Sequence, residues 1–354
     1  MISRSRSRNR RTVRRKSPRL ALRAVPHTKP RVAPAKRLAM PEMVFILAPP
    51  RSFTSITCGM LGQHPQLFGL PELRLFVADT VGEWLDLCSK ATYPMASGTL
   101  RTVAELIFGQ QSALSITMAQ AWLAERSHWT TYQLTKTLAE VVHPRILLDK
   151  SPNLVYQPAA LVRLHRNFPD ARFIYLTRHP RGHGESVLKL KAHVEKLKGP
   201  LSADHWLIQI SSFPAISASD LAEPGVLDPQ RGWYTLNSNV CKFLSSVSTD
   251  QKFTIRGEDL LADPDTWLRT TADWLGLRSD ASAIEAMRHP ENSPFVGFGP
   301  KGASRGNDPF FLRNPVFQPR DERSMSLEGP LSWRSDGRGF LPEVKELARS
   351  LGYS

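Results

Sequence analysis

Five consecutive residues, from Arg51 to Ser55, combine a permanent cation with three hydroxyl groups and contain no acid. The hydroxyls belong to Ser52, Thr54 and Ser55, and Phe53 stands between them. A guanidinium and several hydroxyls in so short a stretch can donate hydrogen bonds to one anion from several sides. An ordinary helix cap also uses a Ser or Thr, but it requires neither the arginine nor the repeated hydroxyls. The stretch therefore indicates an anion-binding site.

The residues on either side predict the elements that position this stretch. Residues 44–48 form a short apolar run that two prolines stop abruptly, which is typical of a buried strand. Apolar residues at helical spacing follow over residues 56–61, and we expect the helix to end near Gly62. The first backbone N–H groups of a helix have no partner within it and carry partial positive charge. A strand, a polar turn and a helix in this order direct those groups at an anion.

A second pair of anion ligands, Arg178 and Ser186, is predicted from another strand and turn. Residues 172–177 show the strongest strand pattern in the chain, and a helix is expected to begin near Glu185. Arg178 then stands at the carboxyl end of the strand and Ser186 in the first turns of the helix, so both side chains can reach one anion. The two histidines of this turn are expected to be exposed or to be local hydrogen-bond partners, and we assign them no role.

Two further candidates lie next to predicted strands. Residues 145–150 are typical of a buried strand that ends in Lys150. Open α/β sheets bind their ligands at the carboxyl ends of strands, which favours a functional lysine there. Glu72 follows a short extended segment over residues 65–70. A charged residue at a strand end is often merely solvent-facing, so both candidates have a plain structural alternative.

The remaining pattern describes the frame around these candidates. Residues 73–142 are expected to be mainly helical, with aromatic residues in the core and one part shaping a ligand pocket. Residues 191–232 are typical of loops with a short helix near Trp206, a candidate mobile cover. The elements expected further on are a helix from Trp233 to Leu244, a strand over residues 252–256, a helix between Asp263 and Gly276, and a Gly/Pro-rich loop over residues 298–309.

Length and composition bound the kind of protein. With 354 residues, of which 41% are apolar, the chain is long enough for one large α/β domain or two smaller ones. No run approaches the ~18 consecutive apolar residues that span a bilayer, so we expect no transmembrane segment. The three cysteines, Cys58, Cys88 and Cys241, are odd in number and widely separated, which favours neither a disulfide framework nor a zinc site. We therefore expect a cytoplasmic protein.

The net charge of +15 is concentrated at the amino terminus. Residues 1–40 hold 14 of the 47 Lys and Arg residues and no Asp or Glu, which leaves 33 basic against 32 acidic residues in the rest of the chain. Such a segment cannot bury enough apolar surface to fold alone, so we predict a disordered tail over residues 1–42 and one domain over residues 43–354. The tail is expected at most to contact nucleic acid or acidic surfaces weakly. An upstream translated extension and an organellar targeting peptide are the alternatives.

The motifs resemble those of one known family. Residues 48–55 lack both glycines and the lysine of the triphosphate loop GxxxxGK[ST], which disfavours a Mg-triphosphate site. Instead, APPRSFTSI followed by LGQHPQLFGLPE resembles the 5′-phosphosulfate loop of the sulfotransferases, PRSGTT with HP and PE downstream. Arg178 and Ser186 keep the spacing of that family's 3′-phosphate motif, and the KSP sequence at Lys150 is similar to a KxP motif of the protein-tyrosine branch. Phe53 stands where the family usually has glycine.

This resemblance, which extends from residue 43 to the C-terminus, implies an α/β fold of the P-loop-like type, with three layers and a central parallel sheet flanked by helices. It implies transfer of a sulfuryl group from 3′-phosphoadenosine-5′-phosphosulfate (PAPS), with PAP as product, to a hydroxyl or amine. The acceptor would be a small molecule or a carrier-bound group, and no metal would be needed. The donor-binding residues implied are Arg51, Ser52, Phe53, Thr54, Ser55, Arg178, Ser186, Lys301 and Gly302.

The same resemblance implies roles for individual residues. Lys301 and Gly302 match a loop similar to the family's RKGxxGDW segment, with Arg305 as a substitute cation. A further segment after residue 256 resembles RYEDL, with Gly257 in place of the usual tyrosine, and its acids are expected to organise structure. In catalysis, Arg51 and Lys150 are expected to stabilise charge on the departing bridge oxygen, and Glu72 to take the acceptor's proton as general base.

Two other function classes stay open at this point. A nucleotide or small-molecule kinase on a related α/β core would show magnesium-dependent turnover of ATP. A nucleic-acid- or protein-binding module would act through the basic tail and lose its binding when residues 1–40 are removed, whereas sulfuryl transfer should survive that truncation. The sequence does not define the acceptor, for which carbohydrate, lipid, polyketide, peptide tyrosine and small phenol all remain open.

Overall fold

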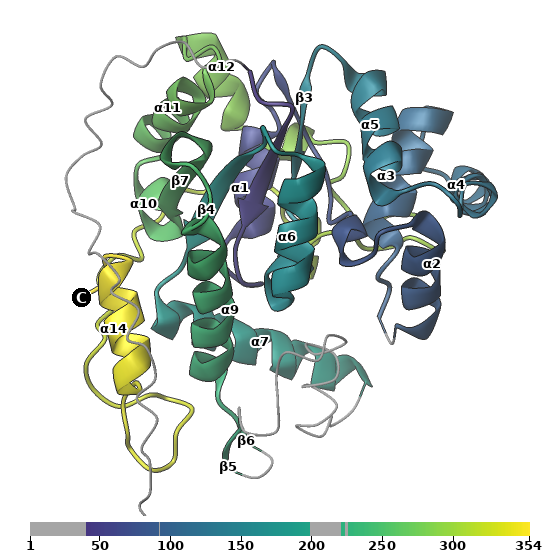
Figure 1. Ribbon diagram of the computed structural model, residues 1–354. Helices are drawn as coiled ribbons and strands as arrows, with labels where there is room; N and C mark the ends of the chain where they lie inside the picture. Colours follow the sequence, from purple (N-terminus) through teal and green to yellow (C-terminus); the bar gives the residue numbers. More distant parts are fainter. Residues whose placement is uncertain (1–39, 92, 199–220, 224–225) are drawn as a thin grey trace, which may run out of the picture.

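The computed structural model describes residues 40–91, 93–198, 221–223 and 226–354 (Figure 1). In these ranges the main sheet has five parallel strands in the order β2-β3-β1-β4-β7. The strands are β1 (Met43–Leu47), β2 (Leu67–Gly69), β3 (Ile146–Asp149), β4 (Arg172–Thr177) and β7 (Lys252–Arg256). A small antiparallel pair consists of β5 (Leu221–Glu223) and β6 (Val226–Leu227). Of the predicted basic tail over residues 1–42, residues 1–39 lie outside the described part.

Helices cover both faces of the main sheet. The larger helices are α1 (Thr54–Leu61), α2 (Val81–Lys90), α3 (Ser97–Phe108), α4 (Ala113–Glu125), α5 (Thr131–Val142), α6 (Pro158–Asn167), α7 (Pro180–Lys198), α9 (Pro229–Leu244), α11 (Pro264–Leu275) and α14 (Pro342–Ser350). The shorter ones are α10 (Gly257–Ala262), α12 (Ala281–Met287), α13 (Pro309–Arg313), and the single turns η1 (Leu75–Val77), η2 (Pro152–Tyr156), η4 (Thr249–Gln251) and η5 (Pro290–Asn292).

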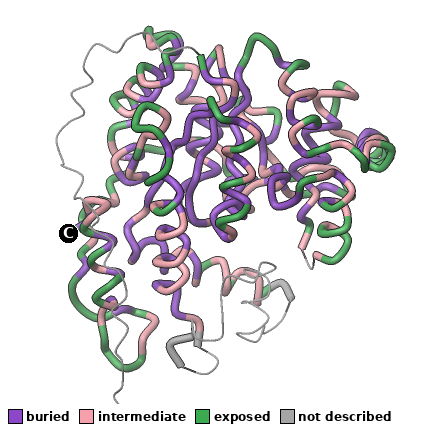
Figure 2. Tube along the Cα trace, in the orientation of Figure 1, coloured by how far each residue is buried: buried purple, intermediate pink, exposed green. Residues whose placement is uncertain are grey.

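The central strand β1 shows why the sheet is a middle layer. All five of its residues are buried, as expected for a parallel strand covered on both faces. Because side chains alternate along a strand, Phe45 and its neighbours at two-residue spacing enter one apolar cluster, whereas Val44 and Ile46 enter another. The first cluster includes residues of α2 to α6 and α9, and the second includes residues of α1, α10, α11 and α12. Figure 2 shows this buried centre, and the three-layer α/β fold predicted above is confirmed.

Two helices begin earlier than the sequence indicated. The helix expected from Glu185 is α7, which starts at Pro180 and continues to Lys198, so the loop expected from residue 191 is wrong as far as residue 198. The short helix expected near Trp206 falls outside the described residues. Helix α9 starts at Pro229 because the Asp228 side chain caps it, accepting from the backbone N–H of Gln230, and proline suits the first helical position.

Parallel strands bring the predicted functional residues to one edge of the sheet. The carboxyl ends of β1, β3 and β4 lead directly to the Arg51 turn, to Lys150 and to Arg178. Such ends are where open α/β sheets place their ligand sites. None of the helices in the described ranges combines the length and the apolar character that a membrane crossing requires.

Candidate active site

The turn between β1 and α1 holds two residues in a left-handed backbone conformation. Arg51 has φ of 70° and Phe53, the N-cap of α1, has φ of 61°. Side chains make this region costly for residues other than glycine, so the surrounding structure must hold the turn in place. The turn directs the N-terminus of α1 and the hydroxyls of Thr54 and Ser55 at the sheet edge. The Ser52 hydroxyl is buried and has no hydrogen-bond partner in the structure.

Arg51 ties this turn to helix α7 and to the C-terminal part of the chain. Its Nε donates to Ser186 Oγ at 3.1 Å, and its guanidinium forms an ion pair with Asp308. Burial and the nearby charge of Arg178 lower the pKa of Arg51 to about 10, against the opposing effect of Glu72. The guanidinium therefore remains a cation at neutral pH.

Arg178 joins the same cluster from the end of β4. Its Nη1 donates to the Arg51 carbonyl at 2.9 Å, and its Nη2 lies 3.2 Å from Glu322 Oε2. Its guanidinium lies over the Phe53 ring, 4.0 Å from the ring centroid. The Nε atom is buried and has no partner in the structure. Arg178 and Ser186 line the same cavity, and their binding of one anion stays a prediction.

A cavity of about 690 Å³ opens beside these residues, and we call it the Arg178 cavity. Its walls combine the Arg51 turn and the start of α1 with α7 and with residues 308–325. Cations and aromatic rings alternate in these walls: Lys189 lies 5.5 Å from the Phe310 ring centroid, and Arg320 lies 5.7 Å from that of Phe53. The cavity therefore offers both positive charge and flat apolar surfaces.

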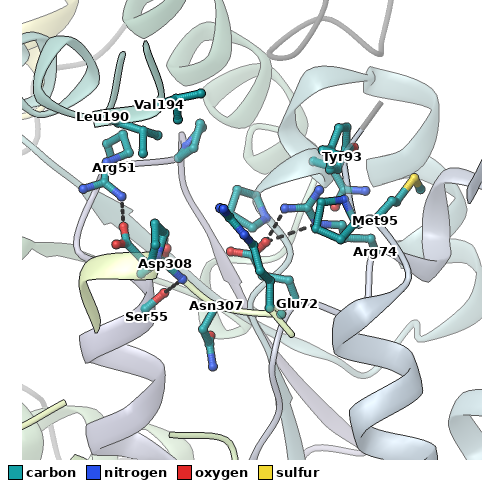
Figure 3. A pocket seen from close by; sticks show the side chains of 18 of the residues that line it. Arg51, Ser55, Glu72, Arg74, Tyr93, Met95, Leu190, Val194, Asn307 and Asp308 are labelled. Carbon is teal, nitrogen blue, oxygen red and sulfur yellow. Dashed lines mark hydrogen bonds and ion pairs between the residues drawn. The ribbon is translucent and has the colours of Figure 1, made fainter. Parts of the chain in front are cut away.

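A second cavity, of about 250 Å³, lies on the other side of the turn and contains Glu72 (Figure 3). We call it the Glu72 cavity. Lys150 Nζ lies 2.8 Å from Glu72 Oε1, and the Arg74 guanidinium pairs with the other carboxylate oxygen. Burial alone would raise the pKa of Glu72, but the charges of Lys150 and Arg74 outweigh it and hold the pKa at about 2. Glu72 is a carboxylate at every working pH.

The two cavities share a wall. Both are lined by Arg51, Thr54, Ser55 and Asp308. Ser55 Oγ accepts from the Asp308 backbone N–H at 3.2 Å and from Lys150 Nζ at 2.8 Å. Figure 3 shows Arg51 and Asp308 facing Glu72 and Arg74 across this region. A group held by the shared wall can therefore meet one ligand from each cavity.

Lys150 lies behind the cavity surfaces rather than in them. Its side chain is fully buried and lines neither cavity, and it reaches the shared wall only through Ser55 and Glu72. Behind it, burial raises the pKa of Asp149 to about 7, although hydrogen bonds from Ser151 and from the Leu73 backbone act in the opposite direction. In this geometry Lys150 holds other residues in place, which differs from the direct role predicted for it.

The structure does not bring Lys301 and Gly302 to the Arg178 cavity, contrary to the prediction. Both are exposed, and neither lines the Arg178 or the Glu72 cavity. The loop is fixed on the face of α3, because Arg101 donates to the carbonyl oxygens of Gly297 and Arg305 at 3.2 and 3.1 Å. Arg305 lines the Glu72 cavity instead of the Arg178 cavity.

Several residues at the site were not found from the sequence. Arg74 pairs with Glu72. Asp308 pairs with Arg51, and Glu322 pairs with Arg178. Asp308 precedes Pro309, which is a helix-start signal and correctly indicates the cap of α13, but not the ion pair. For Glu322 no sequence signal exists, because its partner lies 144 residues away along the chain.

The remaining residues that the sequence singled out serve the structure. His183 Nε2 lies 3.0 Å from the Pro50 carbonyl, and burial lowers its pKa to about 3, so the neutral ring donates to that oxygen. Glu258 accepts from the His179 backbone N–H at 2.7 Å and from the Tyr353 hydroxyl at 3.0 Å, as expected of an organising acid. The described ranges contain no group of His, Cys, Asp and Glu residues that could hold a metal ion.

Comparison with known proteins identifies the family. The chain matches the model of the sulfotransferase family over residues 41–281. The sulfotransferase domain from the curacin biosynthetic pathway superposes with a TM-score of 0.66 at 25% identity, covering 89% of this chain and 99% of that one. The sulfotransferase domain from the Synechococcus PCC 7002 olefin synthase has the same fold, with a TM-score of 0.63, 23% identity, and coverage of 88% and 94%. No curated relative matches the chain. The family match spans well over half of the sequence, and the chain is therefore a member of the sulfotransferase family.

Proposed function

We propose that this sulfotransferase moves the sulfuryl group of PAPS to a hydroxyl group of an apolar acceptor, with Glu72 as the general base. The observation that carries the proposal is the pair of cavities that meet at Arg51, Thr54, Ser55 and Asp308. One cavity is cationic and large, and the other is smaller and contains a carboxylate. In an in-line sulfuryl transfer, the acceptor oxygen attacks the sulfur from the side opposite the departing phosphate oxygen. Donor and acceptor must therefore occupy adjoining cavities.

The residues of the Arg178 cavity fit the PAPS donor. The two phosphate positions of PAPS require cations and N–H groups, which Arg178, Lys189 and the N-terminus of α1 supply. The buried, unpartnered Nε of Arg178 is a donor that lacks an acceptor, as expected of a residue that binds an anion. The ring of Phe310 offers a flat surface of the kind on which a base stacks. The donor supplies the activated sulfuryl group, and the chain's own residues supply anchorage.

Charge develops on the departing phosphate oxygen as the sulfur–oxygen bond breaks. Arg51 lines both cavities and is a permanent cation, so we assign it the stabilisation of that oxygen. Lys150 is assigned a positioning role, because it contacts Ser55 and Glu72 and is shielded from both cavities. Ser52 and Thr54 complete the turn that holds the donor's 5′ end.

The proton of the acceptor hydroxyl is assigned to Glu72. A pKa of about 2 makes the free carboxylate a weak base, because proton transfer is most efficient when the pKa of the base lies near the working pH. PAPS brings several negative charges to the shared wall, and like charges nearby raise the pKa of a carboxyl group. Binding of the donor would therefore make Glu72 a stronger base at the time when a base is needed.

The Glu72 cavity favours a particular type of acceptor. Val187, Leu190 and Val194 line it from one face of α7, and Met95 lines it from the segment that precedes α3. These walls suit an apolar body, either of a free small molecule or of a carrier-bound group. The cavity also contains Arg74 and other guanidinium groups, which would repel a protonated amine. A hydroxyl is thus favoured over an amine.

The first experiment is titration calorimetry of the purified protein with PAP and, separately, with magnesium and ATP. Micromolar binding of PAP without comparable binding of ATP is the expected result, and the opposite pattern would favour a kinase. Labelled PAPS is then offered with matched acceptors that carry a hydroxyl, an amine or neither on the same apolar body. Transfer to the amine in preference to the hydroxyl would contradict the acceptor assignment. A variant without residues 1–40 should keep both the binding of PAP and the transfer of the sulfuryl group.

A further inference from the structure

Phe53 occupies a backbone position that glycine would adopt without cost. Its φ of 61° and ψ of 14° are left-handed, and side chains make this conformation unfavourable. The ring is nonetheless nearly buried, with 9% of its surface exposed. A bulky residue kept in such a conformation indicates that the ring itself has a use.

The ring of Phe53 supports Arg178. The Arg178 guanidinium carbon lies 4.0 Å from the ring centroid, which is close for a cation–π contact. Nη1 of the same guanidinium is fixed to the Arg51 carbonyl at 2.9 Å. A planar group held at one nitrogen and over one face has little freedom to rotate. Its Nε, which has no partner in the structure, is held in one orientation beside the Arg178 cavity.

Gly257 provides the space for the ring. A Cβ atom placed on Gly257 would lie 2.2 Å from Phe53 Cδ2, a distance that no pair of atoms tolerates. Gly257 begins α10 and does not have a positive φ, so the glycine is required for space and not for conformation. Phe53 and any side chain at position 257 therefore exclude each other. The two residues form a matched pair.

We propose that Phe53, with the space provided by Gly257, is a positioning residue that aims Arg178 at the 3′-phosphate of the donor and so determines selectivity for 3′-phosphorylated nucleotides. This inference rests on the proposed use of PAPS and adds to it a residue that sets donor specificity. It predicts that loss of the ring affects the 3′-phosphate contact and leaves the rest of the nucleotide site intact.

The test compares the affinities of PAP and 5′-AMP, which lacks only the 3′-phosphate, for the wild type and for Phe53→Gly. Glycine suits the backbone at this position, so the variant removes the ring without straining the turn. We expect PAP to bind about tenfold more weakly, as a partly desolvated cation–π contact implies, and AMP to change less than about twofold. Phe53→Tyr should retain most of the PAP affinity, and Phe53→Leu, which fills space without an aromatic face, should behave like the glycine variant.

A second variant tests the role of Gly257. Gly257→Ala pushes the ring away from Arg178 and should weaken PAP binding selectively, but it should cause no further loss in a Phe53→Gly background. Equal losses for PAP and AMP, or additive effects of the two substitutions, would show that the ring only fills space and would overturn the inference. Wild-type protein that binds neither nucleotide would instead refute the proposed donor, and the inference with it. If Gly257→Ala fails to fold, the PAP affinities of Phe53→Tyr and Phe53→Leu still decide whether the aromatic ring or only its volume matters.

Discussion

The two cavities hold their charges in opposite ways. In the Arg178 cavity the groups proposed to bind the donor are cations, and both arginines are paired with an acid from residues 308–325: Arg51 with Asp308, and Arg178 with Glu322. In the Glu72 cavity the functional group is an acid, and two cations hold it. An anionic donor can replace the acids of the first cavity. A neutral hydroxyl entering the second cavity needs no such exchange, because it meets a carboxylate that is already fixed.

The two cavities also differ in whether a partner of their ion pairs is fully buried. The pairs of the Arg178 cavity are partly exposed, since the side chains of Arg178 and Glu322 keep 12% and 23% of their surface. The Arg74–Glu72 pair is equally exposed, at 23% and 12%, and only the Lys150–Glu72 pair differs, because its lysine is fully buried. Partly exposed pairs contribute little and are easily exchanged, whereas removal of one partner from a buried pair is costly. The buried Lys150 therefore fixes Glu72 in place, whereas no fully buried partner holds Asp308 or Glu322.

The largest expected effect concerns the fixed carboxylate. Replacement of Glu72 by Gln should lower kcat by about 10²- to 10⁴-fold, the usual contribution of a general base, while PAP still binds. Steady-state kinetics with labelled PAPS and calorimetry with PAP measure the two quantities. Glu42→Gln is the matched control, because it removes another carboxylate paired with a lysine, Lys136, at 2.5 Å and away from the two cavities. Unchanged turnover in Glu72→Gln would exclude Glu72 as the base.

The next largest effect concerns the exchangeable cation. Arg178→Ala should weaken PAP binding by about 10- to 100-fold, as loss of a charge-assisted hydrogen bond implies, and leave the melting temperature nearly unchanged. The matched control is Lys191→Ala on α7, a cation that is paired with Glu195 at 2.5 Å and lines neither cavity. Equal PAP affinity in wild type and Arg178→Ala would remove Arg178 from the donor site.

How much of this site was predictable depends on distance along the chain. The Arg51 turn and the Arg178–Ser186 pair lie within short strand–turn–helix segments, where local patterns determine both structure and position. The edge at which they meet follows from the parallel sheet. The fold class and the strands at residues 172–177 and 252–256 were predictable for the same reason.

The positions of the residues that face the Arg51 turn from other parts of the chain were not predictable, because only tertiary contacts determine them. The loop that contains Lys301 was matched to a motif by its glycines, but its path is fixed by Arg101 of α3, almost 200 residues earlier in the chain. Glu322 reaches Arg178 from a segment without regular structure. The ion pairs of Glu72 likewise follow from packing, so the low pKa of the predicted base could not be known from the sequence.

The fixed carboxylate also predicts a pH dependence. Because the pKa of Glu72 is about 2 in the enzyme without donor, kcat/KM for PAPS should show no acid limb from this residue between pH 5 and 8. Lys150→Met removes the larger of the two charges that lower the pKa, so burial should then raise it and an acid limb should move upward toward this range. Initial rates across pH 4.5 to 8 test both statements. A wild-type limb that disappears in Glu72→Gln would show that the two cations do not control the carboxylate in the free enzyme.

The smallest effect concerns Glu322, the acid that we expect an anionic donor to displace. Glu322 pairs with Arg178 at 3.2 Å and with Arg320 at 2.7 Å, and thus occupies a position of negative charge that a phosphate could take. Glu322→Gln weakens this competing pair, and PAP affinity should rise by about two- to fivefold, the range expected for a partly exposed ion pair. Glu328→Gln, which loses pairs with Lys345 and Arg349 outside both cavities, should leave affinity unchanged. If PAP binding instead weakens in Glu322→Gln, the carboxylate contacts the donor itself, and the Arg178 cavity does not load by exchange of anions.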